Sequence, residues 1–216
     1  MFTRTLAVAV LATAALPAAA QTTDVAKWTR DLASTSGEVR RDAASKLNHC
    51  AAACSAALPA LVTMMQGTDP RDVSEAAFAL QQILTGLQTP AAALFGAAPP
   101  AAFTGGCRAV RPAARRVLKG AAPATTNEAE FAQTETITLL ALCAEVEDVP
   151  SLARIVAAPA FRANTRLAAI GALSKMGPTA AGALPALQAV AGDASDKYAD
   201  ILVPRAKAAI NSIQGH

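Results

Sequence analysis

The stretch VRRDAASKLNHCAAACSAALPALV, residues 39–62, aligns without a gap on TRLAAIGALSKMGPTAAGALPALQ, residues 165–188. Arg40 falls on Arg166, and both copies contain the same five residues, Ala-Leu-Pro-Ala-Leu, near their ends. The offset between the copies is 126 residues (165 − 39), or three steps of 42. A period of about 40 to 47 residues is typical of chains built from repeated pairs of helices. The sequence therefore predicts a chain of this kind.

Looser copies of the same two elements occur elsewhere in the chain. Residues 149–152 repeat the Leu-Pro-Ala-Leu element, 110–118 repeat the Val-Arg-x-x-Ala-x-x-x-Leu element, and 204–209 carry a degraded terminal version. The spacing of 110–118 is that of a second helix, although its order in the chain suggests a first helix. Together the copies predict helices over 24–34, 37–49, 55–66, 70–87, 107–119, 127–145, 148–158, 162–176, 179–192 and 197–213.

The alternation of a Leu-Pro-x-Leu helix with a Val-Arg-x-x-Ala-Ala-x-x-Leu helix resembles the HEAT-repeat family, over nearly all of residues 24–213. The resemblance implies an all-α fold, an α-solenoid (superhelix) of about five two-helix HEAT-like repeats. It also implies protein partners rather than small molecules, bound on a concave face that the second helices line. The family's arginine, here Arg40 and Arg166, commonly bonds to an acidic residue, for which the candidates are Asp31, Glu38, Asp69 and Asp193.

Composition agrees with a helical fold and narrows the choice of partner. The chain has one Trp, one Tyr and six Phe and no runs of β-branched residues, whereas alanine, the strongest helix former, dominates. The formal net charge is only +3, too small to indicate nucleic acid as a partner.

The first residues have the layout of a secretory signal peptide. Arg4 precedes an apolar run over 5–16, and small residues at Ala18 and Ala20 predict cleavage before Gln21. The run is too short to span a bilayer, and no comparable stretch follows it.

The sequence is therefore expected to comprise a signal peptide, 1–20, and one HEAT-like repeat domain, 21–216. We expect an exported, soluble, monomeric protein of the bacterial periplasm, with no membrane span after removal of the signal.

Four cysteines, Cys50, Cys54, Cys107 and Cys143, are an even number, which in an exported chain indicates disulfides. Three pairings are possible, and we favour Cys50–Cys54 with Cys107–Cys143.

The aligned copies give a reason for the first pair. Cys50 falls on Met176, and Ala51-Ala52 fall on Gly177-Pro178, so the earlier copy lacks the Gly-Pro sequence at the turn. A disulfide from Cys50 to Cys54 would stabilise that turn, and it requires a break in the helix at 51–53.

An alternative function centres on the same stretch. His49, Cys50 and Cys54 could form a soft-metal site or a redox pair in a periplasmic metal-handling or thiol-redox protein. A metal site needs more ligands, however, and the only other histidine is His216.

No catalytic motif is present, and the sequence indicates a protein that is not an enzyme and has no cofactor. The expected function is a non-catalytic interaction or scaffold module of the bacterial cell envelope. The candidate partner-binding residues are outward polar side chains of the second helices: Arg41, Gln81, Gln82, Arg162 and Lys175.

Two further segments have open interpretations. The basic strip over 108–119 either complements the acidic residues over 128–148 or binds an acidic partner. The connection over 88–106, with Phe95 and Phe103, either covers neighbouring helices or reaches a partner.

Overall fold

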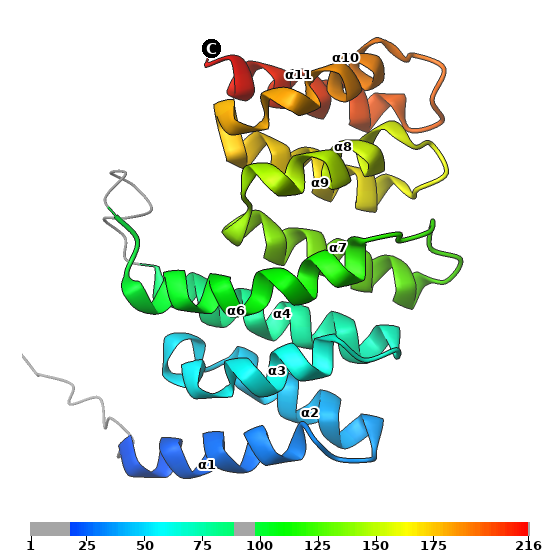
Figure 1. Ribbon diagram of the computed structural model, residues 1–216. Coiled ribbons are helices and arrows are strands. Elements are labelled where there is room, and N and C mark those ends of the chain that lie inside the picture. Colours follow the sequence, from blue (N-terminus) through cyan, green and yellow to red (C-terminus); the bar gives the residue numbers. More distant parts are fainter. Residues whose placement is uncertain (1–17, 89–97, 216) are drawn as a thin grey trace, which may run out of the picture.

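The computed structural model describes residues 18–88 and 98–215, and within these ranges helices joined by turns account for the chain and no strand occurs (Figure 1). The prediction of an all-α protein is confirmed. Residues 1–17, which include most of the predicted signal peptide, lie outside the described residues, as do Phe95 and His216. Helix α1 (Ala18–Asp31) begins three residues before the predicted cleavage position.

The helices alternate in the order that the repeat predicts. The first helices of the pairs are α1, α3 (Leu58–Met65), α6 (Ala101–Leu118), α8 (Val149–Ala157) and α10 (Leu184–Gly192). The second helices are α2 (Gly37–Asn48), α4 (Pro70–Leu87), α7 (Asn127–Cys143), α9 (Ala163–Met176) and α11 (Ala199–Gln214). Short 3-10 helices precede three of the first helices: η1 (Ala51–Ala57), η2 (Val146–Asp148) and η3 (Gly177–Ala183).

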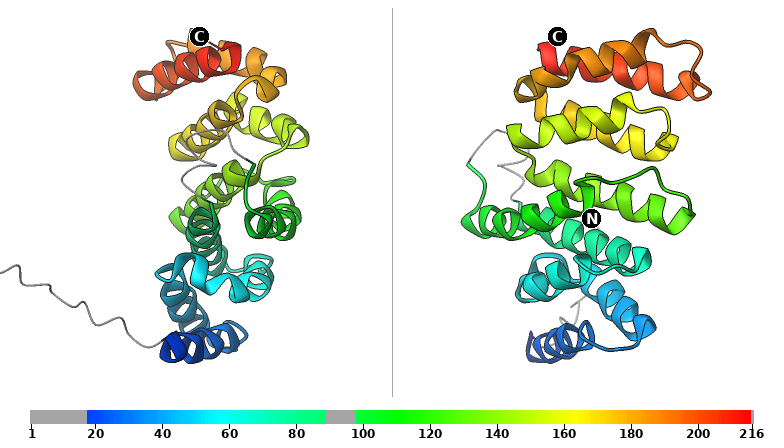
Figure 2. Two further views of the ribbon diagram at one scale, coloured as in Figure 1. Left: turned by 90° about the vertical axis from the view of Figure 1, so that its left-hand side faces the viewer. Right: turned by 45° about the vertical axis from the view of Figure 1, so that its right-hand side comes forward.

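The helix pairs follow one another along one direction, from α1 and α2 at one end to α10 and α11 at the other (Figures 1 and 2). The second helices contact one another in chain order: α2 packs on α4, α4 on α7, α7 on α9, and α9 on α11. The result is an unbroken layer of second helices, whose outward side we call the second-helix face.

Small side chains allow these helices to approach closely. Alanines are fully buried where helices cross, and leucines and isoleucines fill the space between them, in one continuous core. The buried alanines include Ala43, Ala44, Ala76, Ala77, Ala113, Ala114 and Ala169.

Helix starts follow local sequence. Ser36 accepts a hydrogen bond from the Val39 amide at the start of α2, and Thr126 accepts one from the Ala129 amide at the start of α7. At α4, Asp69 caps the helix and Pro70 occupies its first position.

The predicted start of α6 is wrong by six residues, since this helix begins at Ala101 and not at 107. Gly105-Gly106, typical of a loop, lie inside the helix. A Cβ atom at Gly106 would come within 2.5 Å of Leu84 Cδ2, so glycine here allows α6 to pack closely on α4. Phe103 is buried in the same helix and covers neighbouring helices.

The turns of the two aligned copies have the same structure. η1 and η3 occupy equivalent positions, and each begins at a residue with positive φ: +44° at Ala51 and +55° at Gly177. The predicted helix break at 51–53 is therefore confirmed. Gly86 of α4 packs directly on this turn, since a Cβ there would lie 2.7 Å from the Ala52 nitrogen.

Candidate functional site

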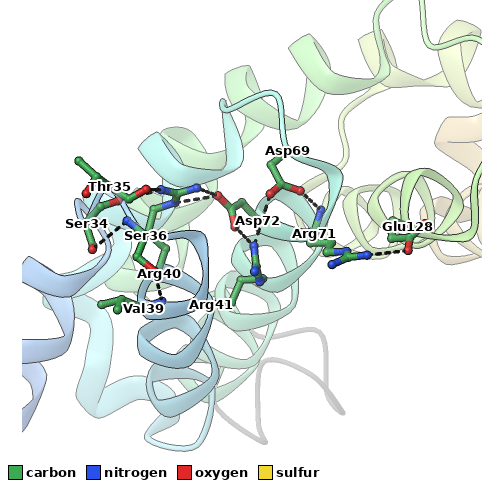
Figure 3. A network of polar contacts seen from close by, with 10 residues as sticks. All are labelled: Ser34, Thr35, Ser36, Val39, Arg40, Arg41, Asp69, Arg71, Asp72 and Glu128. Carbon is green, nitrogen blue, oxygen red and sulfur yellow. Dashed lines mark hydrogen bonds and ion pairs between the residues drawn. The ribbon is translucent and has the colours of Figure 1, made fainter.

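Arginines that bridge neighbouring helix pairs are the most prominent polar feature of the structure. The Arg40 guanidinium donates from Nε to Asp72 Oδ2 at 2.7 Å and from Nη1 to the Ser34 carbonyl oxygen at 2.8 Å (Figure 3). Asp72 is only 4% exposed. Because Asp72 belongs to the first turn of α4, this contact ties the turn before α2 to the next pair of helices.

Arg166 makes the equivalent contacts in the later copy. It is buried, and it donates to the Val156 carbonyl oxygen at 3.0 Å and to Asp196 Oδ2 at 2.5 Å. The hydrogen bond from Arg166 is the main reason that the pKa of Asp196 lies below its ordinary value. This carboxylate therefore stabilises the fold at neutral pH, and the contribution is lost when acid protonates it.

The arginines therefore have intramolecular acidic partners, as the sequence predicts, but the predicted candidates are wrong. The partners are Asp72 and Asp196, and none of Asp31, Glu38, Asp69 and Asp193 forms an ion pair with either arginine. The reason is that the partner comes from the second helix of the following pair, or the turn just before it, and sequence proximity does not reveal this choice.

A third bridge uses the basic strip of α6. Arg115 Nε donates to Asp148 Oδ1 at 2.5 Å, and Arg111 donates to the Cys143 carbonyl oxygen at 2.9 Å and pairs with Glu145 at 2.7 Å. The hydrogen bond to Asp148 is the largest cause of the raised pKa of Arg115. These contacts support the interpretation of the strip as a complement to acidic residues.

The cysteines form two disulfides, Cys50–Cys54 and Cys107–Cys143, with Cα–Cα distances of 5.6 and 5.2 Å. This is the pairing that the sequence favours. The first disulfide spans the start of η1, and the second joins α6 to the end of α7.

His49 is an exposed residue that ends α2 and lies next to the first disulfide. Sulfurs that are bonded to each other are not thiolate ligands, so the metal alternative would first require reduction of the disulfide, whereas a redox pair would alternate between this disulfide and two thiols. Within residues 18–88 and 98–215, no group of three or more His, Cys, Asp or Glu side chains is arranged to hold a metal ion.

The predicted partner-binding residues have different environments on the second-helix face. Arg41 pairs with Asp72 at 3.0 Å and Arg162 pairs with Glu130 at 2.8 Å, so both are part of the internal ion pairs. Gln81 and Gln82 are half-buried on α4, and Lys175 is the one exposed residue among the five.

Sequence reasoning missed the aromatic and acidic residues of this face. Phe78 of α4 and Phe131 of α7 are 38% and 58% exposed, which is unusual for side chains of this size. Glu75 and Glu135 lie on the same two helices and are half-buried. The helical period could have revealed these residues. They occupy the side of the period that faces solvent, where aromatic residues are not required for folding.

A groove opens beside them, between α7, α9 and α11, with a volume of about 540 Å³. Phe131, Glu135, Leu167, Gly171 and Arg205 are among the residues that line it. The groove is open to solvent along the second-helix face and has a mixed polar and apolar lining, which suits a side chain of another protein better than an enclosed small molecule.

No protein-family model matches this sequence, and a comparison with curated proteins finds no match either. In the described part of the chain, no helix has the length and apolar character needed to cross a membrane. The repeat and the geometry of the second-helix face are therefore the features from which a function can be inferred.

Proposed function

We propose that the chain is a HEAT-like α-solenoid of about five helix pairs that acts as a non-catalytic interaction module. It binds a protein partner on the second-helix face. The observation that carries this proposal is the unbroken layer of α2, α4, α7, α9 and α11, whose solvent side carries two exposed phenylalanines, Phe78 and Phe131, of which Phe131 lines an open groove.

The internal ion pairs support a scaffold role. Arg40–Asp72, Arg115–Asp148 and Arg166–Asp196 each join one helix pair to the next. In a stacked array each unit contacts only its neighbours, so such bridges help to fix the angle between units and thereby the shape of the binding face.

We also propose that the protein works in the periplasm. The N-terminal sequence has the layout of an export signal, and two disulfides are compatible with an oxidising compartment. Osmotic-shock fractionation of cells that express the full chain tests this. Recovery of the oxidised protein with the cytoplasmic fraction would contradict it.

Site-specific photo-crosslinking in cells tests the binding face. A photoreactive amino acid replaces Phe78 or Lys175 on the second-helix face, and control variants carry it at Arg108 or Lys119 of the exposed side of the first-helix layer. Replacement of these exposed side chains leaves the core unchanged. We expect a discrete adduct from the first two positions and none from the controls; adducts from the control positions alone would refute the assignment of the face.

A further inference from the structure

Two glutamates in the middle of the second-helix face have no ion-pair partner in the part of the chain that the structure describes. Glu75 of α4 and Glu135 of α7 are half-buried, and among the residues that the structure describes neither forms an ion pair. Their neighbours differ in this respect, since Glu128 is paired with Arg71 at 3.1 Å and Glu130 with Arg162 at 2.8 Å.

The pKa of Glu135 is raised above its ordinary value. Burial is the larger cause of the raised pKa of Glu135, and the charge of Glu75 across the α4–α7 contact is the second. Both effects oppose ionisation of Glu135, so this arrangement does not serve stability.

Exposed aromatic rings flank the glutamates. Phe78 lies three residues after Glu75 on α4, and Phe131 lies four residues before Glu135 on α7, so each ring shares a helix face with its glutamate. A cation that enters between the carboxylates would therefore have apolar surface next to it, where the aliphatic part of an arginine or lysine side chain can pack.

The groove continues this surface on the side of α9 and α11. Phe131 and Glu135 form its wall on α7, and Gly171 of α9 leaves open space, since a Cβ there would meet no atom within 4 Å. Thr134 also lines the groove, and its buried Oγ1 has no hydrogen-bond partner among the described residues. Arg205 lines the groove from α11, so positive charge at that side disfavours a second cation.

We propose that the second-helix face binds a protein segment that inserts an arginine or lysine side chain between Glu75 and Glu135 and an adjacent apolar side chain against Phe131 in the groove. This inference rests on the proposed function and names the class of partner. Charge complementarity favours a cationic segment, because within the described residues this face offers two carboxylates without an ion pair, and each has an exposed aromatic ring on the same face of its helix.

Selection of short random peptides displayed on phage, with the oxidised full chain immobilised, tests the inference. The dissociation constants of the selected peptides are then measured by fluorescence anisotropy for four single variants. Glu75→Gln and Glu135→Gln remove one charge each at constant shape, Gly171→Leu fills the groove, and Gly171→Ala is its matched control. The Gly171 variants should fold, because a Cβ atom at this position would meet no atom within 4 Å.

We expect the selected peptides to carry arginine or lysine next to a large apolar residue. Their dissociation constants should rise about tenfold in each glutamine variant and be unchanged in Gly171→Ala, and binding should be lost in Gly171→Leu. Binding should also weaken as salt concentration rises. Thermal unfolding of each variant at neutral pH checks that a loss of binding does not reflect a loss of fold.

Several outcomes would overturn the inference. Selected peptides without a basic residue, or unchanged binding to Glu135→Gln, would show that the carboxylates do not choose the partner. Concentration-dependent dimers of the chain that Gly171→Leu abolishes would identify a second copy as the occupant. If binding is lost in Gly171→Leu but unchanged in both glutamine variants, the inference fails and the proposed function stands. If none of these substitutions on the second-helix face affects binding, both fail.

Discussion

Replacement of Ala51 by glycine should stabilise the protein. Ala51 begins η1 with φ of +44°, and it is the only non-glycine residue with positive φ in the described part of the chain. The later copy has Gly177 at the equivalent position, with φ of +55°. The two copies thus make the same turn, but only one has the residue that adopts this conformation without a steric penalty.

The magnitude follows from two opposing terms. For a residue that has a Cβ atom, the left-handed conformation costs roughly 1–2 kcal/mol. Against this, glycine loses more conformational entropy on folding than alanine, which costs about 0.5–1 kcal/mol. Ala51→Gly should therefore stabilise by about 0.5–1 kcal/mol, which corresponds to a rise in Tm of about 1–4 °C for a chain of this length. The reverse change, Gly177→Ala, should destabilise by roughly 1 kcal/mol or more. Space is not limiting there, since the nearest atom to the added Cβ is the Ser212 carbonyl oxygen at 3.9 Å.

Urea unfolding of the oxidised protein, followed by far-UV circular dichroism, measures both effects as shifts of the midpoint at constant m value. Ala53→Gly is the matched control, because Ala53 is an exposed residue of the same 3-10 helix without positive φ. It should destabilise by about 0.5–1 kcal/mol. If Ala51→Gly destabilises as much as the control, positive φ at residue 51 is not a source of strain and the reasoning is wrong.

Three further predictions concern the disulfides, the unpaired glutamate and the buried ion pair. Loss of Cys107–Cys143 through serine substitutions should lower the free energy of unfolding by about 4 kcal/mol, and loss of Cys50–Cys54 by about 2 kcal/mol. The difference is expected because stabilisation grows with the length of the closed loop, and the sequence separations are 36 and 4 residues. Urea titrations that give equal losses would contradict this. Glu135→Gln should raise Tm at pH 7, because a carboxyl whose folded pKa is raised above the ordinary 4.5 destabilises the fold once pH exceeds that value. The rise in Tm should vanish below a pH of about 4.5. Thermal unfolding of both proteins between this pH and pH 7 measures the effect, and a variant that is less stable than the wild type at neutral pH would refute the reasoning. Arg166→Met should lower the free energy of unfolding by about 3–5 kcal/mol, because it leaves the charge of Asp196 buried and unpaired. The double variant that also carries Asp196→Leu should lose less stability than Arg166→Met alone. If the losses of the two single substitutions add up in the double variant, this reason is wrong.

Particular elements show where sequence reasoning succeeds. The ungapped alignment of 39–62 on 165–188 predicted two helices of each copy within a few residues, and it predicted the break that η1 and η3 form. The predicted start of α6 was wrong because Gly105-Gly106 are typical of a loop. In the structure, close packing of α6 against Leu84 explains the glycine at position 106.

The candidate site shows the same division. The outward polar residues predicted from sequence included Arg41 and Arg162, which the structure uses in ion pairs with α4 and α7. The unpaired Glu75 and Glu135 were not distinguished from any other solvent-exposed acid. Whether a charge is paired depends on which residue of the next helix pair lies opposite, and this is a property of the packing angle.

The sequence by itself determined the all-helical class, the positions of most helices and the use of the four cysteines in disulfides, because helical period, turn residues and composition act locally along the chain. Only the tertiary structure decided which acids the arginines bind, how closely α6 approaches α4, and which side chains are left without partners on the second-helix face. These outcomes depend on the distances between helices that are far apart in the sequence, and no local pattern encodes those distances.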